Sequence, residues 1–192
     1  SFKPMSDYLI NTPEDYNKIY QKSTNDVEEF WGTLAKDNFK WQKPWNSVLE
    51  WDFSKPEVKW FRGSKLNITE NCIDRHLKNN GDKTAIIFEP NDINDKSEHI
   101  SYGDLYKRVN RMANVLKDIG VKKGDRVCIY LPMIPELAVS VLACARIGAV
   151  HSVVFAGFSS SALSTRINDC QCEVVITSDG SFRGNKILNL KE

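Results

Sequence analysis

The segment between residues 126 and 158 constrains the fold of this chain more than any other part of its sequence. Residues 126–131 form a short run rich in β-branched and aromatic side chains, which predicts a strand. A helix is predicted to begin at Pro135, because the missing N–H of proline costs nothing in a first helical turn. Gly148 is predicted to end that helix in the left-handed conformation. The residues between them are apolar on most sides, so we expect a buried helix.

A second apolar run at residues 150–155 completes a strand–helix–strand unit. It is apolar on both faces except at His151, and strands buried on both faces are typical of parallel sheets. We therefore expect two parallel strands joined by a right-handed crossover. The turn that follows, Phe155-Ala156-Gly157-Phe158, lies at a carboxyl end of the predicted sheet. Open α/β folds place their ligands at such ends, although a simple strand-to-helix turn would have the same residues.

The strand–helix pattern repeats toward the C-terminus. Residues 173–177 predict a third parallel strand, and a further helix is predicted from Arg183 onward. Residues 84–88 and 99–102 predict an antiparallel hairpin upstream of the central unit. The expected fold class is α/β, with an open, mostly parallel sheet and flanking helices. Because three parallel strands would leave an exposed edge, we expect part of a larger domain of a longer protein.

Residues 1–66 are predicted to form an N-terminal extension, and residues 67–192 the first part of that large domain, which is incomplete here. Thr12-Pro13-Glu14 has the residue types of a helix start, and a second helix is predicted to begin near Asn25 or Asp26. All five tryptophans lie between residues 31 and 61. Acidic side chains cancel the basic charge among them, which argues against stacking on nucleic-acid bases. The pattern favours an irregular, aromatic-rich segment that attaches the extension to a larger body.

Composition excludes several classes of function. The net charge of +1 argues against a broad surface for nucleic acid or anionic lipid. No run of about 18 uncharged apolar residues is present, so no membrane span is expected. We predict no metal site and interpret the cysteines as structural thiols of a reducing compartment. The cysteines are Cys72, Cys128, Cys144, Cys170 and Cys172.

Two cations near the C-terminus form a candidate anion site. Arg183 and Lys186 are three residues apart, so they would share a face on the first turn of the predicted helix. The N-terminus of a helix with two cations suits a phosphate, and the alternative is a solvated basic surface. The segment from Gly180 to Lys186 is not a Walker phosphate loop, because its spacing is too short and Ile187 replaces the hydroxyl.

Several long motifs point to a known family. They include residues 71–77 (NCIDRHL), 81–87 (GDKTAII), 120–127 (GVKKGDRV) and 142–155 (LACARIGAVHSVVF). From about Tyr16 to Lys186, the chain resembles the N-terminal portion of the AMP-forming acetyl-CoA synthetases, which are adenylate-forming enzymes. The resemblance implies a ligase that converts acetate and ATP to acetyl-adenylate and pyrophosphate, after which coenzyme A displaces AMP. ATP, coenzyme A and Mg²⁺ are its implied cofactors.

The resemblance also implies which residues contact coenzyme A. An Arg-Gly-Gly-Arg stretch of the family contacts its nucleotide end, and this stretch corresponds to Arg183-Gly184-Asn185-Lys186 here. Asn185 and Lys186 depart from the family pattern; lysine keeps the charge but not the planar, bidentate reach of arginine. The family's Phe-Gly-Gly-Phe turn near coenzyme A corresponds to Phe155-Ala156-Gly157-Phe158, with Ala156 as the departure.

The family's ATP phosphate loop, acetate pocket and C-terminal lysine do not occur in these residues. No catalytic residue is therefore predicted, and the chain by itself is expected to be inactive. A propionyl-CoA or other short-chain acyl-CoA synthetase is one alternative, and a non-catalytic coenzyme A-binding or interaction module is another. Acetate, ATP and coenzyme A are the expected partners, with neither nucleic acid nor membrane. A cytoplasmic location is expected, with nucleus and mitochondrion as alternatives, and the residues do not indicate an oligomeric state.

Overall fold

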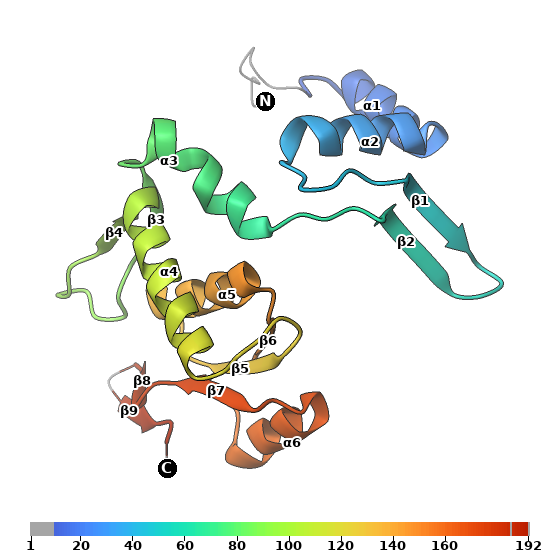
Figure 1. Cartoon of the computed structure of the whole chain (residues 1–192). Helices are drawn as coiled ribbons and strands as arrows, with labels where there is room; N and C mark the ends of the chain where they lie inside the picture. Colours follow the sequence, from blue (N-terminus) through green and yellow to red (C-terminus); the bar gives the residue numbers. More distant parts are fainter. Residues whose placement is uncertain (1–9, 185, 192) are drawn as a thin grey trace. The chain divides into compact units, whose positions relative to one another are not determined.

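The structure, a computed structural model, describes residues 10–184 and 186–191. The chain separates into two compact units, Ser1–Leu66 and Asn67–Glu192 (Figure 1). No helix in the described part of the chain is both long and apolar enough to cross a membrane.

Unit 1 contains two helices followed by a hairpin. Thr12 caps the first helix: its hydroxyl accepts a hydrogen bond from the Asp15 N–H, and the Asp15 carboxylate accepts one from the Thr12 N–H. Both predicted helices are confirmed. The prediction of an irregular segment is wrong for residues 47–62, which form a hairpin. Its two strands are antiparallel, with Ser47 opposite Arg62 and Asp52 opposite Glu57. The elements are α1 (Pro13–Asn25), α2 (Val27–Asn38), β1 (Ser47–Asp52) and β2 (Glu57–Arg62).

The aromatic side chains of unit 1 pack against one another. Trp41 lies at the centre of one group, with ring centroids 5.1 Å from Trp45 and 5.4 Å from Phe61. Its indole N–H donates a 3.0 Å hydrogen bond to the Ala35 carbonyl near the end of α2. The same carbonyl accepts a hydrogen bond from the Phe39 N–H, so the indole is a second donor that ties the aromatic group to the last turn of α2. Trp41 and Trp45 therefore pack within unit 1 itself.

Unit 2 begins with a helical segment and a hairpin. The predicted hairpin between residues 84–88 and 99–102 is confirmed, since the two strands pair antiparallel. The Ser101 hydroxyl then caps the long helix α4 by accepting a hydrogen bond from the Asp104 N–H. The elements are the π-helical turn η1 (Glu70–Asp74), α3 (Arg75–Asn80), β3 (Thr84–Phe88), β4 (Glu98–Ser101) and α4 (Tyr102–Asp118).

The centre of unit 2 is a three-stranded parallel sheet in the order β6-β5-β7. This confirms the α/β fold class and the three predicted parallel strands. Gly148 ends the crossover helix with φ of 76°, as its place in the sequence predicts. The elements are β5 (Arg126–Tyr130), α5 (Pro135–Ile147), β6 (Val150–Val153), α6 (Ser160–Cys170) and β7 (Val174–Thr177).

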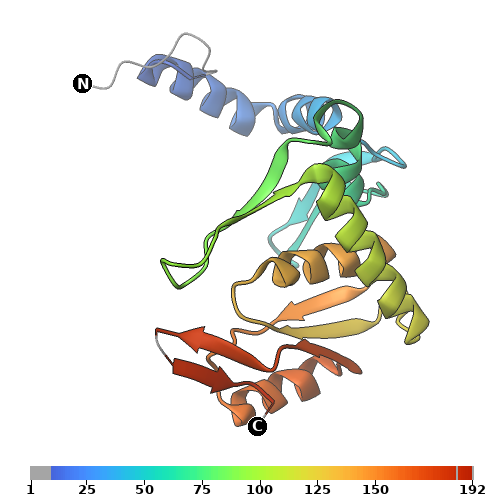
Figure 2. The same ribbon diagram turned by 90° about the vertical axis from the view of Figure 1, so that its left-hand side faces the viewer.

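Strand β5 is buried on both of its faces. Val127 and Ile129 belong to the cluster that β5 forms with α4 and α5. Cys128 and Tyr130 belong to a second cluster, against which α6 packs. Alternate side chains of a strand point to opposite faces, so α5 and α6 must cover opposite sides of the sheet, as Figure 2 shows.

The outer strand β6 differs from its prediction. Val150 and Val153 are 53% and 51% exposed, and the strand ends at Val153 rather than at Phe155. The prediction of burial on both faces is therefore wrong for β6. The physical reason is its place at the edge of the described sheet, where only β5 pairs with it.

The chain after β7 also differs from its prediction. Strands β8 (Gly180–Arg183) and β9 (Lys186–Asn189) form an antiparallel hairpin where a helix was predicted from Arg183 onward. Gly184 has φ of 58°, and a left-handed glycine is typical of the tightest hairpin connections. The helix prediction is therefore wrong, and the argument that placed Arg183 and Lys186 at a helix N-terminus no longer applies.

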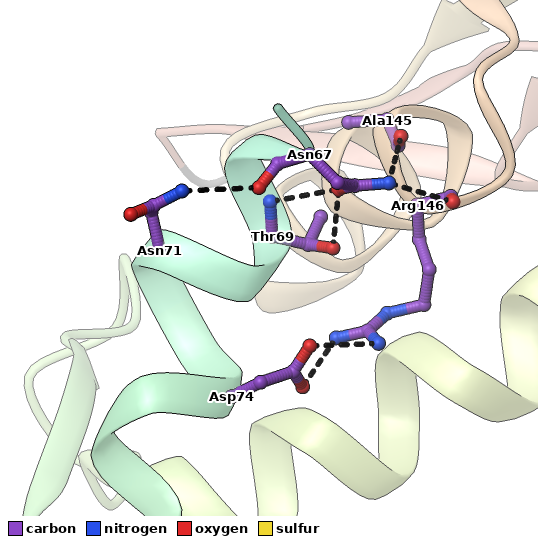
Figure 3. A network of polar contacts seen from close by, with 6 residues as sticks. All are labelled: Asn67, Thr69, Asn71, Asp74, Ala145 and Arg146. Atoms are coloured by element: carbon purple, nitrogen blue, oxygen red, sulfur yellow. Dashed lines mark hydrogen bonds and ion pairs between the residues drawn. The ribbon is translucent and has the colours of Figure 1, made fainter. Parts of the chain in front are cut away.

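A polar network fastens the start of unit 2 to the end of α5 (Figure 3). The Asn67 amide donates to the carbonyls of Ala145 and Arg146, at 3.3 and 3.0 Å, and so caps the C-terminus of α5. The two Nη atoms of Arg146 donate to the two oxygens of Asp74, at 2.9 and 3.2 Å. Two-point contacts of this kind fix geometry as well as charge. The network therefore holds η1 against α5.

We predict that Ile129→Ala destabilises the protein by about 2–5 kcal/mol, because it removes methyl groups from a strand that is buried on both faces. Ile87→Ala on β3 is the matched control, since Ile87 is exposed, and its expected effect is below about 0.5 kcal/mol. Urea unfolding of both variants measures the difference. Equal destabilisation by the two variants would contradict the central position of β5.

Candidate binding site at the carboxyl edge of the sheet

The candidate site residues follow the carboxyl ends of two strands in the same sheet. Phe155, Ala156 and Gly157 follow β6, whereas Arg183 and Lys186 lie in the hairpin that follows β7. Because the strands are parallel, both segments begin at the same edge. Strand β5 lies between β6 and β7, so the two starting points are about 10 Å apart, or two strand spacings. The structure therefore brings the two predicted segments to one edge.

The turn after β6 holds Ala156 inward and Phe155 outward. Ala156 is only 5% exposed and packs in the cluster with Cys128, Tyr130 and Val154. Phe155 is 65% exposed. Ala156 replaces the first glycine of the family's Phe-Gly-Gly-Phe turn. Its methyl group packs in the core and therefore does not narrow the solvent side of the turn.

Gly157 leaves room for the aromatic ring of Phe155. A Cβ atom at this position would lie 2.4 Å from Cε1 of Phe155, so the exposed ring would have to move. The rings of Phe155 and Phe158 meet edge to face, with centroids 5.9 Å apart. The guanidinium of Arg166, on α6, lies 4.5 Å from the centre of the Phe158 ring. Ring contacts therefore shape the turn.

Tyr130 is a residue of this site that sequence reasoning missed. It is the last residue of β5, and its side chain is buried. Its hydroxyl donates a 2.9 Å hydrogen bond to the Phe158 carbonyl and lies 3.3 Å from the Ala156 carbonyl. The signal in the sequence is a tyrosine at the carboxyl end of a buried strand, because a buried hydroxyl needs a partner. Tyr130 thus fixes the turn from the neighbouring strand.

The two cations of the candidate anion site face each other across the hairpin. Arg183 and Lys186 are direct partners in the ladder between β8 and β9, and both are exposed. Directly opposed residues of an antiparallel pair project to the same face with their Cβ atoms about 5 Å apart. Within residues 10–184 and 186–191, no acid forms an ion pair with either cation. Like charges so placed destabilise a hairpin, and an anion bound between them would relieve the repulsion.

The connection between β8 and β9 contains the two other candidate residues. The Gly184 carbonyl accepts a 3.2 Å hydrogen bond from the Asn91 amide, which belongs to the loop between β3 and β4. Asn185 lies outside the described residues. Asn91 thus contacts the candidate segment from a distant part of the sequence, and the sequence pattern alone gave no sign of this contact.

The base of the hairpin rests on the same apolar cluster as the turn after β6. Leu190 packs against the cluster that contains Tyr130 and Ala156, and its N–H donates a 2.9 Å hydrogen bond to the Asp179 carbonyl. The carboxylate of Asp179 pairs with Lys191, whose hydrogen bond lowers the pKa of that carboxyl. One cluster therefore supports both segments of the candidate site.

No group of three or more His, Cys, Asp or Glu side chains that could hold a metal is found in the described ranges. The candidate site is thus a pair of cations beside an exposed aromatic turn. Its chemistry suits the recognition of an anion with an adjoining apolar or extended part.

The sequence of this chain matches known families and known proteins. Residues 16–72 match the family model of the acetyl-coenzyme A synthetase N-terminus, and residues 73–192 match that of the AMP-binding enzymes. The chain is 54% identical over 178 residues to an acetyl-coenzyme A synthetase of Halorhodospira halophila, and 52% identical over 192 residues to one of Alkalilimnicola ehrlichii. These matches cover 93% and 98% of this chain but only 27% and 30% of the relatives.

A solved structure contains the same fold. The acetoacetyl-CoA synthetase from Streptomyces lividans matches 92% of this chain with a TM-score of 0.84 and 26% sequence identity. The match covers 27% of that protein, so the fold described here is part of a larger domain. With its AMP-binding match over residues 73–192, the chain belongs to the AMP-binding enzymes.

Proposed function

We propose that the protein containing this chain is an ATP-dependent acetate–CoA ligase, which forms acetyl-CoA, AMP and diphosphate from acetate, ATP and coenzyme A. The observation that carries this proposal is the identity above 50% to relatives named acetyl-coenzyme A synthetase, over more than 90% of the chain. The chain spans less than a third of those relatives, so the activity is that of the whole protein.

The proposed chemistry explains why such an enzyme needs ATP. A carboxylate is a poor acyl donor, and its conversion to a mixed anhydride with AMP makes the carbonyl carbon electrophilic. Positioning and stabilisation of charge then account for most of the catalysis. ATP, acetate and Mg²⁺ belong to the proposed complete enzyme, and none of them is assigned to a residue of this chain.

Within this chain, Arg183 and Lys186 are proposed to bind a phosphate at the nucleotide end of coenzyme A. Their opposed side chains form an exposed pair of like charges that an anion would neutralise. Gly184 and Asn185 connect the two cations, so the ligand would approach the backbone there. Phe155, Ala156 and Gly157 are proposed to line the path of the rest of the molecule, with the exposed Phe155 ring as the contact and Gly157 as the space for that ring.

We predict that Arg183→Ala raises the KM for coenzyme A about five- to thirtyfold in the full-length enzyme, because an exposed charge-assisted contact is worth about 1–2 kcal/mol. Acetate-dependent exchange of pyrophosphate into ATP reports adenylation alone and should hardly change. Arg183→Lys should lose less than Arg183→Ala, since it keeps the charge.

Lys117→Ala is the control for this prediction. It removes an exposed cation from the last turn of α4, from which the chain leads to the amino end of β5. The KM for coenzyme A should stay within about twofold of the unaltered enzyme. A collapse of the pyrophosphate exchange in Arg183→Ala, with an unchanged KM for coenzyme A, would show that Arg183 serves ATP or the fold instead.

We also predict that Tyr130→Phe raises the KM for coenzyme A about two- to tenfold and costs about 0.5–1.5 kcal/mol of stability, because the Phe158 carbonyl loses its hydrogen-bond donor. Tyr20→Phe in unit 1 removes a hydroxyl from an exposed ring and should change neither quantity. Steady-state kinetics and thermal unfolding measure the two effects. Lower stability with an unchanged KM would mean that Tyr130 supports the core but not the ligand path.

A different acyl specificity is the second candidate function. The structural neighbour from Streptomyces lividans is named as an acetoacetyl-CoA synthetase, so this fold also occurs with a larger acyl group. Pyrophosphate release by the full-length enzyme, measured with acetate, propionate, butyrate and acetoacetate, separates the candidates. The absence of release with every acid would favour a non-catalytic coenzyme A-binding or interaction module.

The cytoplasm is the compartment that we propose for the reaction. The relatives described above are bacterial, and they give no support to a nuclear or mitochondrial location. The proposed partners are the small-molecule substrates alone.

A further inference from the structure

Two cysteines meet where α6 ends and β7 begins. Cys170 is the last residue of α6, and Cys172 follows it after one residue. Their Sγ atoms are 3.0 Å apart, which is about 1 Å longer than a disulfide bond. Both thiols are free and partly exposed. We propose that Cys170 and Cys172 are a reversible redox pair, a modification site that a low-molecular-weight disulfide oxidises to an internal disulfide.

The backbone holds the two thiols together. Gln171, between them, has the left-handed conformation, with φ of 52° and ψ of 46°. The Gln171 N–H donates to the Asn168 carbonyl and the Cys172 N–H donates to the Ile167 carbonyl, which is the hydrogen-bond pattern of a tightly closed helix end. A fixed turn keeps both side chains on one side of the chain. Their contact thus depends on the backbone and not only on flexible side-chain torsions.

A guanidinium group fixes this turn from the neighbouring strand. Nε of Arg126 donates to the Cys170 carbonyl and Nη2 donates to the Gln171 carbonyl, each at 3.1 Å. Arg126 is the first residue of β5, which is the central strand of the sheet. The turn that carries the two thiols is therefore tied to the most deeply buried strand of unit 2.

The two sulfurs differ in surroundings, which sets the order of the reaction. Cys172 packs against the apolar cluster that contains Cys128 and Tyr130, and burial together with the Cys170 contact raises its pKa to about 12. A thiol that stays protonated does not begin an exchange. We therefore assign the first attack to Cys170 and the second to Cys172.

Cys170 loses its proton to water, and its thiolate attacks a disulfide R–S–S–R, so that a bond between its Sγ and one sulfur forms, the S–S bond breaks and RS⁻ leaves. Cys172 transfers its proton to this RS⁻ and attacks Sγ of Cys170. This attack expels the second RS⁻, which takes a proton from water. Two cysteine thiols are oxidised and one R–S–S–R is reduced to two thiols.

The other cysteines make the site selective. Cys128 and Cys144 are fully buried, and burial raises the pKa of both thiols, that of Cys144 to about 11. Cys72 is exposed, but no other cysteine is in contact with it among the described residues, so it can only form a mixed disulfide with R–S. An internal disulfide is therefore expected at Cys170 and Cys172 and not at the other three.

The redox pair lies at the edge of the sheet opposite to the candidate binding site. Cys172 precedes the amino end of β7, whereas Arg183 follows its carboxyl end. Oxidation would lock the connection between α6 and β7 without contacting the residues proposed for coenzyme A. The test of the redox proposal is consequently independent of the proposed function.

The test treats the full-length, folded protein, in a Cys72→Ser background, with oxidised glutathione. The peptide that contains residues 170–172 should lose two hydrogen atoms in mass, carry no glutathione, and return to its original mass with dithiothreitol. Cys172→Ser should instead accumulate glutathione on Cys170. Cys170→Ser should leave Cys172 unmodified, or modified at least about tenfold more slowly, because its thiol packs against the apolar cluster.

Two results would overturn the proposal. A glutathione adduct that persists on Cys170 while Cys172 is intact would show that the second thiol cannot reach the first. Failure of both thiols to react, while Cys72 in the unaltered protein does react, would show that the pair is inert. Circular dichroism of the serine variants checks that each retains its fold, so that a loss of reaction is not a loss of structure.

Discussion

The burial of β5 on both faces is the constraint on which the rest of unit 2 depends. Val127 and Ile129 fill one side of this strand, and Cys128 and Tyr130 fill the other. A strand of this kind needs a helix on each side and a neighbouring strand along each edge. The crossover through α5 and the return through α6 meet both needs, and they bring the ends of all three strands to one edge.

The candidate binding site is a consequence of that arrangement. The turn after β6 and the hairpin after β7 both begin at the carboxyl edge, and one apolar cluster supports them. The ring of Tyr130 packs in the core, and its hydroxyl donates a hydrogen bond to the turn of the candidate site. The packing that stabilises β5 therefore also positions the segments proposed to hold coenzyme A, and the polar network at Asn67 and Arg146 fixes α5 from its other end.

Local signals in the sequence were sufficient for much of the fold, but not for features that depend on distant partners. The cap at Thr12, the left-handed Gly148 and the three parallel strands follow from short patterns and are confirmed. The helix predicted from Arg183 was wrong because a spacing of three residues suits a helical face and a tight hairpin equally well. Exposure of β6 depends on which strands pair with it, and the role of Tyr130 depends on a turn 28 residues away.

Hydrogen–deuterium exchange of the full-length protein, with and without coenzyme A, tests the central claim most directly, which is that both segments of the carboxyl edge form one site. Bound coenzyme A should slow amide exchange in the turn from Phe155 to Phe158 and in the hairpin from Gly180 to Asn189 together. Exchange in α1 and α2 should not change. Protection of only one of the two segments, or of neither while coenzyme A is bound, would contradict the account.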